Sequence, residues 1–292
     1  MRVKKLFMRY SYILPVIIIL LGVTIFPLIY SLTLSFHSCD LRLGGSWIFN
    51  GLSNYGEALF KDTRFWDSLR NTFLIGIPAI MLEFLIGLGL ALLLNRKIIG
   101  KKIITSLLIL PVMMPPIVAG LIWRVLYHEK YGAINGFLRN LGINAQFTWL
   151  GDPNLARVAV ILVDVWEWTP LMMMILLAGL QSISIEPYES AKIDGASPLQ
   201  IFGYITLPLL RLPIMAAILI RLIDSIKLFD IIFVLTRGGP GGKTETISFY
   251  TYLVGFRYFR MGYAAALSYI LLIITVILSM VFIRVMTRRE AY

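Results

Sequence analysis

Charged side chains interrupt several strongly apolar stretches of the sequence. Carboxylates, an arginine and a lysine at such positions could bind a polar solute or pair with one another. They are Glu83, Asp164, Glu167, Arg221, Asp224, Lys227 and Asp230. A charge is costly in an apolar environment, so each is a candidate for a functional role. Two roles are open: the charges could line a water-filled path and bind the hydroxyls of a polar solute, or they could pair and fix helix packing.

The spacing of three of these charges places them on one face of a helix, because Arg221, Asp224 and Lys227 follow at three-residue steps. Pairing within the helix, Arg221 with Asp224 and Asp224 with Lys227, would serve packing. We favour the packing role for Arg221 and Asp224. For Lys227 and Asp230 we favour the role in lining a water-filled path. The candidates kept for a substrate path are Glu83, Glu167, Asp224, Lys227 and Asp230. Trp166 and Trp168 could stack on a ring-shaped solute, although contact with lipid or a neighbouring helix is the simpler interpretation.

Other residue types with catalytic potential form no recognisable site in the sequence. A single cysteine, Cys39, and two histidines, His37 and His128, give no metal-ligand cluster. The run Gly238 to Thr244 resembles a phosphate-binding loop, but Arg237 stands where that pattern needs its first glycine. We interpret the run as a flexible turn before an outer helix near residues 250–258. We expect no ATPase site and no nucleophile–base pair in this chain.

The elements that position these charges are predicted to be membrane-spanning helices. The chain has 292 residues, of which 58% are hydrophobic and 15% charged, and its mean hydropathy is +0.81. A soluble protein carries about 25% charged residues, and a spanning helix needs about 20 mainly apolar residues. The predicted fold is therefore an all-α polytopic membrane domain with six spans, at about 12–36, 71–94, 103–126, 156–180, 209–236 and 263–284.

The basic residues predict the orientation of these spans. The net charge is +11, and we attribute it to span ends on the cytoplasmic side and not to nucleic-acid binding. With both termini inside, the cytoplasmic segments carry Lys and Arg at nearly twice the density of the outer segments. We therefore expect an N-in, C-in protein of the plasma or inner membrane.

A polar island, residues 186–208, separates the fourth and fifth predicted spans within a cytoplasmic loop at 181–208. Pro187 suits a first helical turn, and Gly195 suits a left-handed helix end. Ser197 can cap a second helix with Pro198 at its first position, running to about Thr206. Pro208 would open the next span. The island is predicted to be a rigid helix–turn–helix below the membrane.

Residues in the island resemble the EAA signature of ABC-importer permeases, in the carbohydrate branch of maltose and glycerol-phosphate type. The matching pattern is Glu189-Ser190-Ala191, Gly195, Ile205 and Leu207-Pro208, with Ser190 in place of the usual alanine. Further matching stretches are Gly51 to Tyr55, Leu110-Pro111 with Pro115-Pro116, Trp149 to Pro153, and Leu235 to Pro240. The resemblance implies that the island is a coupling helix for an ATPase, with contacts from Glu189, Ser190, Ala191, Asp194, Gly195, Ile205, Leu207 and Pro208.

The resemblance implies a permease subunit that translocates a sugar or sugar-like solute. Its implied partners are two cytoplasmic ATPase subunits, which bind ATP and Mg²⁺, a second and different permease, and an extracytoplasmic solute-binding protein. No cofactor is expected in this chain. The alternatives are a stand-alone secondary transporter or channel, which would need paired repeats or broken helices around a midplane site, and a membrane enzyme.

Overall fold

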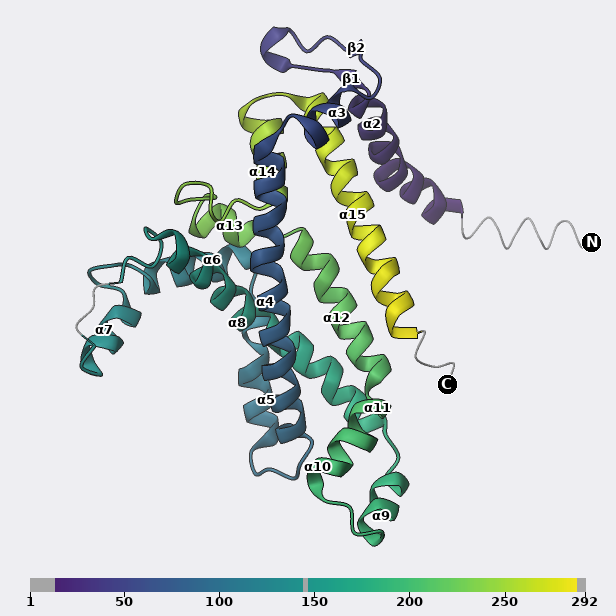
Figure 1. Cartoon of the computed structure of the whole chain (residues 1–292), viewed down its shortest axis with the longest axis vertical. Coiled ribbons are helices and arrows are strands. Elements are labelled where there is room, and N and C mark those ends of the chain that lie inside the picture. Colours follow the sequence, from purple (N-terminus) through teal and green to yellow (C-terminus); the bar gives the residue numbers. More distant parts are fainter. Residues whose placement is uncertain (1–13, 144–146, 288–292) are drawn as a thin grey trace, which may run out of the picture. The chain divides into compact units, whose positions relative to one another are not determined.

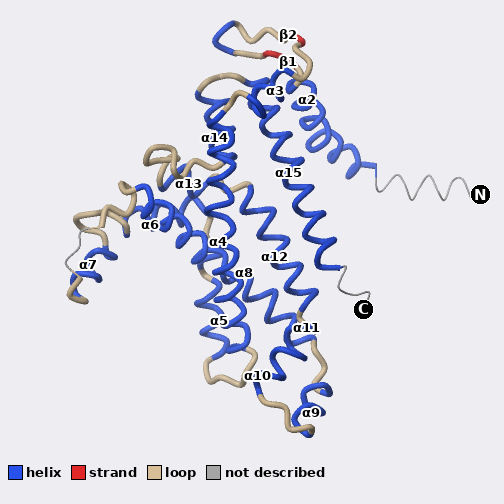
Figure 2. Tube along the Cα trace, viewed as in Figure 1, coloured by secondary structure: helices blue, strands red, loops and turns tan. Residues whose placement is uncertain are grey.

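The computed structural model describes residues 14–143 and 147–287 and is mainly helical (Figure 1). Strand structure within the described residues is confined to one short hairpin (Figure 2). The contacts divide the chain into two compact units, residues 1–65 with 251–273 and residues 66–250 with 274–292.

The first unit joins an apolar helix to a small subdomain that contains a hairpin and a short helix. The helix Leu14–Ser35 contains a π-helical turn at Leu21–Ile25 and the segment α2 (Phe26–Ser35). Next come β1 (His37–Ser38), a 3₁₀ turn (Leu41–Leu43), β2 (Ile48–Phe49) and α3 (Ser53–Phe60). The strands pair antiparallel, with His37 opposite Phe49.

The start of the last helix, α15 (Met261–Thr287), approaches this hairpin closely. A Cβ atom on Gly262 would lie 2.0 Å from the carbonyl oxygen of His37, so only glycine fits at this position. The amide of Gly262 also donates a hydrogen bond to the carbonyl oxygen of Cys39. The hairpin and the start of α15 therefore form one packed piece.

The second unit is a helical bundle with several short helices at its ends. Its elements are α4 (Thr63–Leu94), α5 (Lys101–Ile109), α6 (Pro116–Leu126), α7 (Ala133–Asn140), α8 (Pro153–Ser182), α9 (Glu186–Ile193), α10 (Pro198–Ile201), α11 (Leu207–Leu209), α12 (Arg211–Ile226), α13 (Asp230–Leu235) and α14 (Ile247–Tyr252). The core packs α4 and α8 with residues of α12, around Leu88, Ala91, Met172, Leu176 and Ala217. Five of the seven charges singled out in the sequence lie on these three helices, whereas Lys227 directly follows α12 and Asp230 begins α13.

Four helices within residues 14–143 and 147–287 are long and apolar enough to span a membrane, namely Leu14–Ser35, Thr63–Leu94, Pro153–Ser182 and Met261–Thr287. A fifth candidate is a bent pair, Pro198–Leu209 with Arg211–Ile226, whose axes meet at 64°. The predicted spans at 71–94, 156–180 and 263–284 lie inside longer helices. Residues 12 and 13 of the first predicted span lie outside the described residues.

Two predicted spans are not continuous helices, so those predictions were wrong in this respect. The segment 103–126 divides into α5, a 3₁₀ turn (Pro111–Met113) and α6. Its prolines lack the amide hydrogen that a helix needs at each interior position. The segment 209–236 divides into α12 and α13, with Lys227 ending the first helix. Non-helical backbone at membrane depth is tolerated where it lines a polar cavity, and such a cavity lies at this break.

Candidate functional site

A buried ion cluster joins the three core helices of the second unit. Arg221 on α12 is 2% exposed. Its Nε donates to Glu83 Oε2 on α4 at 2.6 Å, and its Nη2 donates to Glu83 Oε1 and to Asp164 Oδ2 on α8, both at 2.8 Å. The guanidinium also lies over the ring of Trp168, 4.8 Å from its centroid. One arginine therefore holds α4, α8 and α12 together.

This cluster corrects the predicted pairing within α12. Arg221 forms ion pairs with Glu83 and Asp164, and no ion pair joins Arg221 to Asp224, or Asp224 to Lys227, in the described part of the chain. The planar guanidinium suits two carboxylates on facing helices, because its donors form a fixed fork. Sequence spacing indicated the helix face of Arg221 but could not indicate which helices that face meets.

A cavity of about 230 Å³ opens beside this cluster, where α12 ends and α13 begins. Its polar lining is Asp164, Arg221, Asp224, Lys227 and Asp230, and Trp168 and Phe229 supply aromatic faces. The Oδ1 atom of Asp164 is buried and has no hydrogen-bond partner in the protein. A water or a solute hydroxyl would satisfy it. The cavity offers hydrogen-bond acceptors, a cation and aromatic surfaces to one polar ligand.

The five candidates for a substrate path occupy three different surroundings. Asp224, Lys227 and Asp230 line the cavity together. Glu83 is buried behind it and bound to Arg221. Glu167 is also buried, and neither of its carboxylate oxygens has a partner in the protein.

The polar island folds as two capped helices, and the predicted caps are confirmed. Pro187 lies in the first turn of α9, and Gly195 follows α9 with φ +77°. The hydroxyl of Ser197 accepts from the amide of Gln200, whose side-chain oxygen accepts from the amide of Ser197 at 2.7 Å. This reciprocal capping box fixes the start of α10.

The second half of the island differs from the prediction. A π-helical turn (Phe202–Thr206) follows α10, and Pro208 lies inside the helix Pro198–Leu209. The bend comes at Leu210, before α12 begins at Arg211. Pro208 therefore belongs to the island, and the island meets α12 at an angle.

The island presents an uncovered surface that mixes polar and apolar side chains. Glu189, Ser190, Asp194, Gly195 and Pro208 are exposed, and Ala191, Ile205 and Leu207 are half-buried. Three apolar side chains stand out strongly, with Ile193 86%, Leu199 82% and Tyr204 82% exposed. A hollow of about 310 Å³ lies between the turn after α9 and the second helix, lined by Asp194, Gly195, Ala196, Gln200, Ile201, Tyr204 and Ile205. Exposed apolar groups around a hollow are typical of a protein-binding surface.

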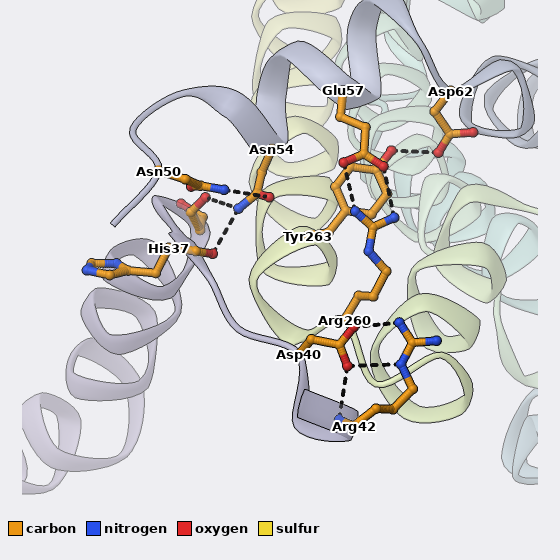
Figure 3. A network of polar contacts seen from close by, with 10 residues as sticks. His37, Asp40, Arg42, Asn50, Asn54, Glu57, Asp62, Arg260 and Tyr263 are labelled. Atoms are coloured by element: carbon orange, nitrogen blue, oxygen red, sulfur yellow. Dashed lines mark hydrogen bonds and ion pairs between the residues drawn. The ribbon is translucent and has the colours of Figure 1, made fainter. Parts of the chain in front are cut away.

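Sequence reasoning missed a polar network in the first unit (Figure 3). Arg260 pairs with both carboxylate oxygens of Glu57, at 2.8 and 2.7 Å, and Tyr263 donates to Asp62. Asn54 donates to the carbonyl oxygens of Ser35 and His37. The partners lie far apart in the sequence, so no local pattern could have found them.

The glycine-rich run 238–244 forms a turn whose backbone groups are hydrogen-bonded by side chains of the protein itself. The side chain of Thr244 is fully buried and donates to the carbonyl oxygen of Gly239 at 2.7 Å. Asn71 donates to the carbonyl oxygen of Gly242. The predicted outer helix follows as α14 and a π-helical turn (Leu253–Arg257).

Long apolar helices, an ion cluster that joins them inside the bundle and an exposed two-helix island define a polytopic membrane permease. The chain belongs to the family described as binding-protein-dependent transport system inner membrane component, whose sequence pattern matches residues 83–290. It is a permease subunit of an ABC-type importer, as its sequence predicts.

Two relatives agree with this assignment, and one solved structure has the same fold. The trehalose/maltose transport system permease protein MalF of Thermococcus litoralis is 36% identical over 94% of this chain and 92% of its own length. The sulfoquinovosyl glycerol transport system permease protein SmoG of Agrobacterium fabrum is 33% identical over 94% of this chain and 89% of its own length. A chain in the crystal structure of a bacterial ABC transporter that imports alginate has the same fold, with TM-score 0.85, 23% identity and coverage of 98% and 97% of the two chains.

Proposed function

We propose that this chain forms half of the pore of an importer for a sugar or sugar-like solute. An extracytoplasmic binding protein delivers the solute, and a second, different permease forms the other half. Two ATPase subunits in the cytoplasm bind ATP and Mg²⁺, and this chain holds no cofactor. The relatives named for trehalose/maltose and sulfoquinovosyl glycerol transport support the solute class. Both termini lie in the cytoplasm in this proposal, as do residues 181–208.

The ATPase docks on the polar island, and the observation that carries this is the island's exposed surface. Ile193, Leu199 and Tyr204 would lose their exposure to water against a partner, and this burial of apolar surface favours association. Glu189 and Asp194 supply charges at the rim, and Gly195 sets the angle between the two helices. The contact set is that implied by the signature, Glu189, Ser190, Ala191, Asp194, Gly195, Ile205, Leu207 and Pro208, together with the exposed apolar side chains of Ile193, Leu199 and Tyr204.

Replacing Glu189 by Ala tests this coupling role. Glu189 is exposed, so the variant should fold and insert normally but lose ATP-driven uptake in vesicles that contain all subunits. Glu186→Ala, another exposed acid in the first turn of α9, is the control and should keep uptake. Gly195→Pro should also abolish uptake, because proline cannot adopt φ +77°. Normal uptake by Glu189→Ala and Gly195→Pro would refute the docking role.

The solute passes the cavity at the end of α12. Asp224, Lys227 and Asp230 bind solute hydroxyls there, and Glu83 and Glu167 support the path from the buried side. Lys227→Met removes a donor from the cavity wall and should raise the solute concentration needed for half-maximal uptake or lower the maximal rate. Lys243→Met, an exposed lysine away from the cavity, is the matched control. Unchanged kinetics in Lys227→Met would place that side chain in packing only.

A further inference from the structure

The outer hairpin of the first unit, residues 37–49, carries apolar side chains on both of its faces. Trp47, Ile48 and Phe49 are consecutive and are 43%, 63% and 73% exposed. Successive residues of a strand point to opposite faces, so Ile48 lies on one face and Phe49 on the other. A partner protein seated on one face would leave the other apolar face in water. A lipid environment can surround both apolar faces of the hairpin at once.

The hairpin folds back along the apolar helix that precedes it. The ring of Trp47 lies edge-on to that of Tyr30, with 5.2 Å between centroids, and His37 contacts the rings of both Trp47 and Phe49. Tyr30 lies five residues before the helix ends at Ser35, which is about 7.5 Å along the axis. Trp47 therefore lies at the depth of Tyr30, inward of the helix end.

The apolar helix before the hairpin is long enough to cross a bilayer. Its described part, Leu14–Ser35, has 22 residues, none of its apolar window is buried in the protein, and it covers about 33 Å, against a hydrocarbon layer of about 30 Å. Polar residues, His37, Ser38 and Asp40, follow this apolar stretch directly. This end of the span therefore lies at the membrane surface, and Tyr30 and Trp47 lie where tyrosine and tryptophan concentrate in membrane proteins.

The charges of the hairpin neutralise each other. Asp40 accepts from the Nε of Arg42 at 2.9 Å and from its Nη2 at 2.5 Å. This hydrogen bonding to Arg42 lowers the pKa of Asp40 to about 2, so the pair keeps both charges at neutral pH. Since these are the only two Asp, Glu, Lys or Arg residues in 37–52, the segment has no net charge to hold it in water.

From this geometry we propose that the hairpin 37–49 lies in the lipid headgroup layer at the outer end of the first span and anchors that end. The segment after β1 pairs with the residues around the start of α15, since Cys39 accepts from Gly262 and Leu41 donates to Phe259. In the described residues β2 pairs with β1 alone, so the backbone groups on its other edge need hydrogen-bond partners that the hydrocarbon core does not offer. The ligand is the outer leaflet itself.

Fluorescence quenching in the assembled transporter tests this proposal. In a Cys39→Ser background, Phe49→Cys and Ile48→Cys are labelled separately with a polarity-sensitive dye, and the complex is reconstituted in phosphatidylcholine vesicles. The control is Tyr131→Cys, which is 73% exposed like Phe49 and follows the charged residues Glu129 and Lys130. The quenchers are iodide in water, a lipid with a nitroxide near the headgroup, and a lipid with a nitroxide deep in the acyl chain.

The headgroup nitroxide should quench both hairpin labels more than the deep nitroxide does. The ratio of lipid to iodide quenching should be several-fold higher at positions 48 and 49 than at position 131. Iodide quenching without lipid quenching would place the hairpin in water and overturn the proposal. Shielding from all quenchers would show a protein cover, and lipid quenching at one face only would show a hairpin lying on a partner. Either result also overturns it, and neither bears on ATP-driven uptake.

Discussion

Arg221 stabilises the bundle because it neutralises two carboxylates that have left water. Removing one partner of a buried ion pair leaves the other charge uncompensated, which typically costs about 3–5 kcal/mol. We therefore predict that Arg221→Met lowers the free energy of unfolding of the permease in detergent by about that amount, measured by thermal or denaturant unfolding. Arg139→Met, an exposed arginine on α7, should unfold like the parent chain.

The triple variant Arg221→Met, Glu83→Gln, Asp164→Asn separates the charge effect from lost packing. With no buried charge left, it should recover most of the stability that Arg221→Met loses, since neutral replacements for a whole ion cluster are often tolerated. Parent-like unfolding of Arg221→Met alone would contradict the role given to the cluster.

At the residue scale, the sequence predicts those contacts that a residue makes with its near neighbours along the chain. The caps at Ser197 and Gly195 are local, so they were predictable. The partners of Arg221 were not, because 57 and 138 positions separate it from Asp164 and Glu83. A single sequence gives the face of α12 on which Arg221 lies but not the helices that this face meets.

Two glycines of α4 differ in their packing: Gly87 lies against α8, and Gly89 faces open space. At the scale of the element, this difference gives a prediction. A Cβ atom on Gly87 would lie 2.9 Å from Met172 Cγ and 3.1 Å from the amide nitrogen of Met173, whereas one on Gly89 would meet nothing within 4 Å. Gly87→Ala should destabilise the permease by about 1–3 kcal/mol, because α4 and α8 must separate. Gly89→Ala should gain up to about 1 kcal/mol from helix propensity.

Thermal unfolding of the two variants side by side checks this prediction. The two substitutions add the same methyl group to the same helix, so a difference in melting temperature reports packing against α8. Equal melting temperatures would mean that α8 can move away at no cost.

Of the two helix breaks inside predicted spans, one could be predicted from the sequence and the other could not. The break between α5 and α6 follows from Pro111, Pro115 and Pro116, which are visible in the sequence. The break between α12 and α13 falls at Lys227 to Phe229, where no proline or glycine marks it. A polar cavity lies at this break, and that cavity is a property of the tertiary fold and not of the local sequence.

The whole molecule is incomplete as a transporter in our proposal, because the energy enters through the island from a partner. We predict that vesicles holding this chain alone accumulate no solute under a proton or sodium gradient. Vesicles that also hold the second permease, the ATPases and the binding protein should accumulate it when ATP is enclosed with the ATPases. Radiolabelled sugar uptake measures both. Gradient-driven uptake by the chain alone would favour a secondary transporter.

At this scale the sequence predicted the membrane class and the family, because composition and the pattern at 189–208 are strong signals. It could not predict the polar network in which Glu57 pairs with Arg260 and Asp62 accepts from Tyr263. Such contacts depend on how the segment after the first helix packs on the start of the last helix, and nothing near these residues in the sequence encodes that packing.

The ion cluster also bears on how the chain is made. Glu83 and Asp164 leave the ribosome before Arg221, so two helices with buried acids enter the membrane before the base that binds them. Residues 1–220 therefore lack the group that joins α4, α8 and α12, and the arrival of Arg221 closes the bundle. We expect nascent chains that stop short of Arg221 to remain open and to be removed by membrane proteases, while chains extended past it become resistant.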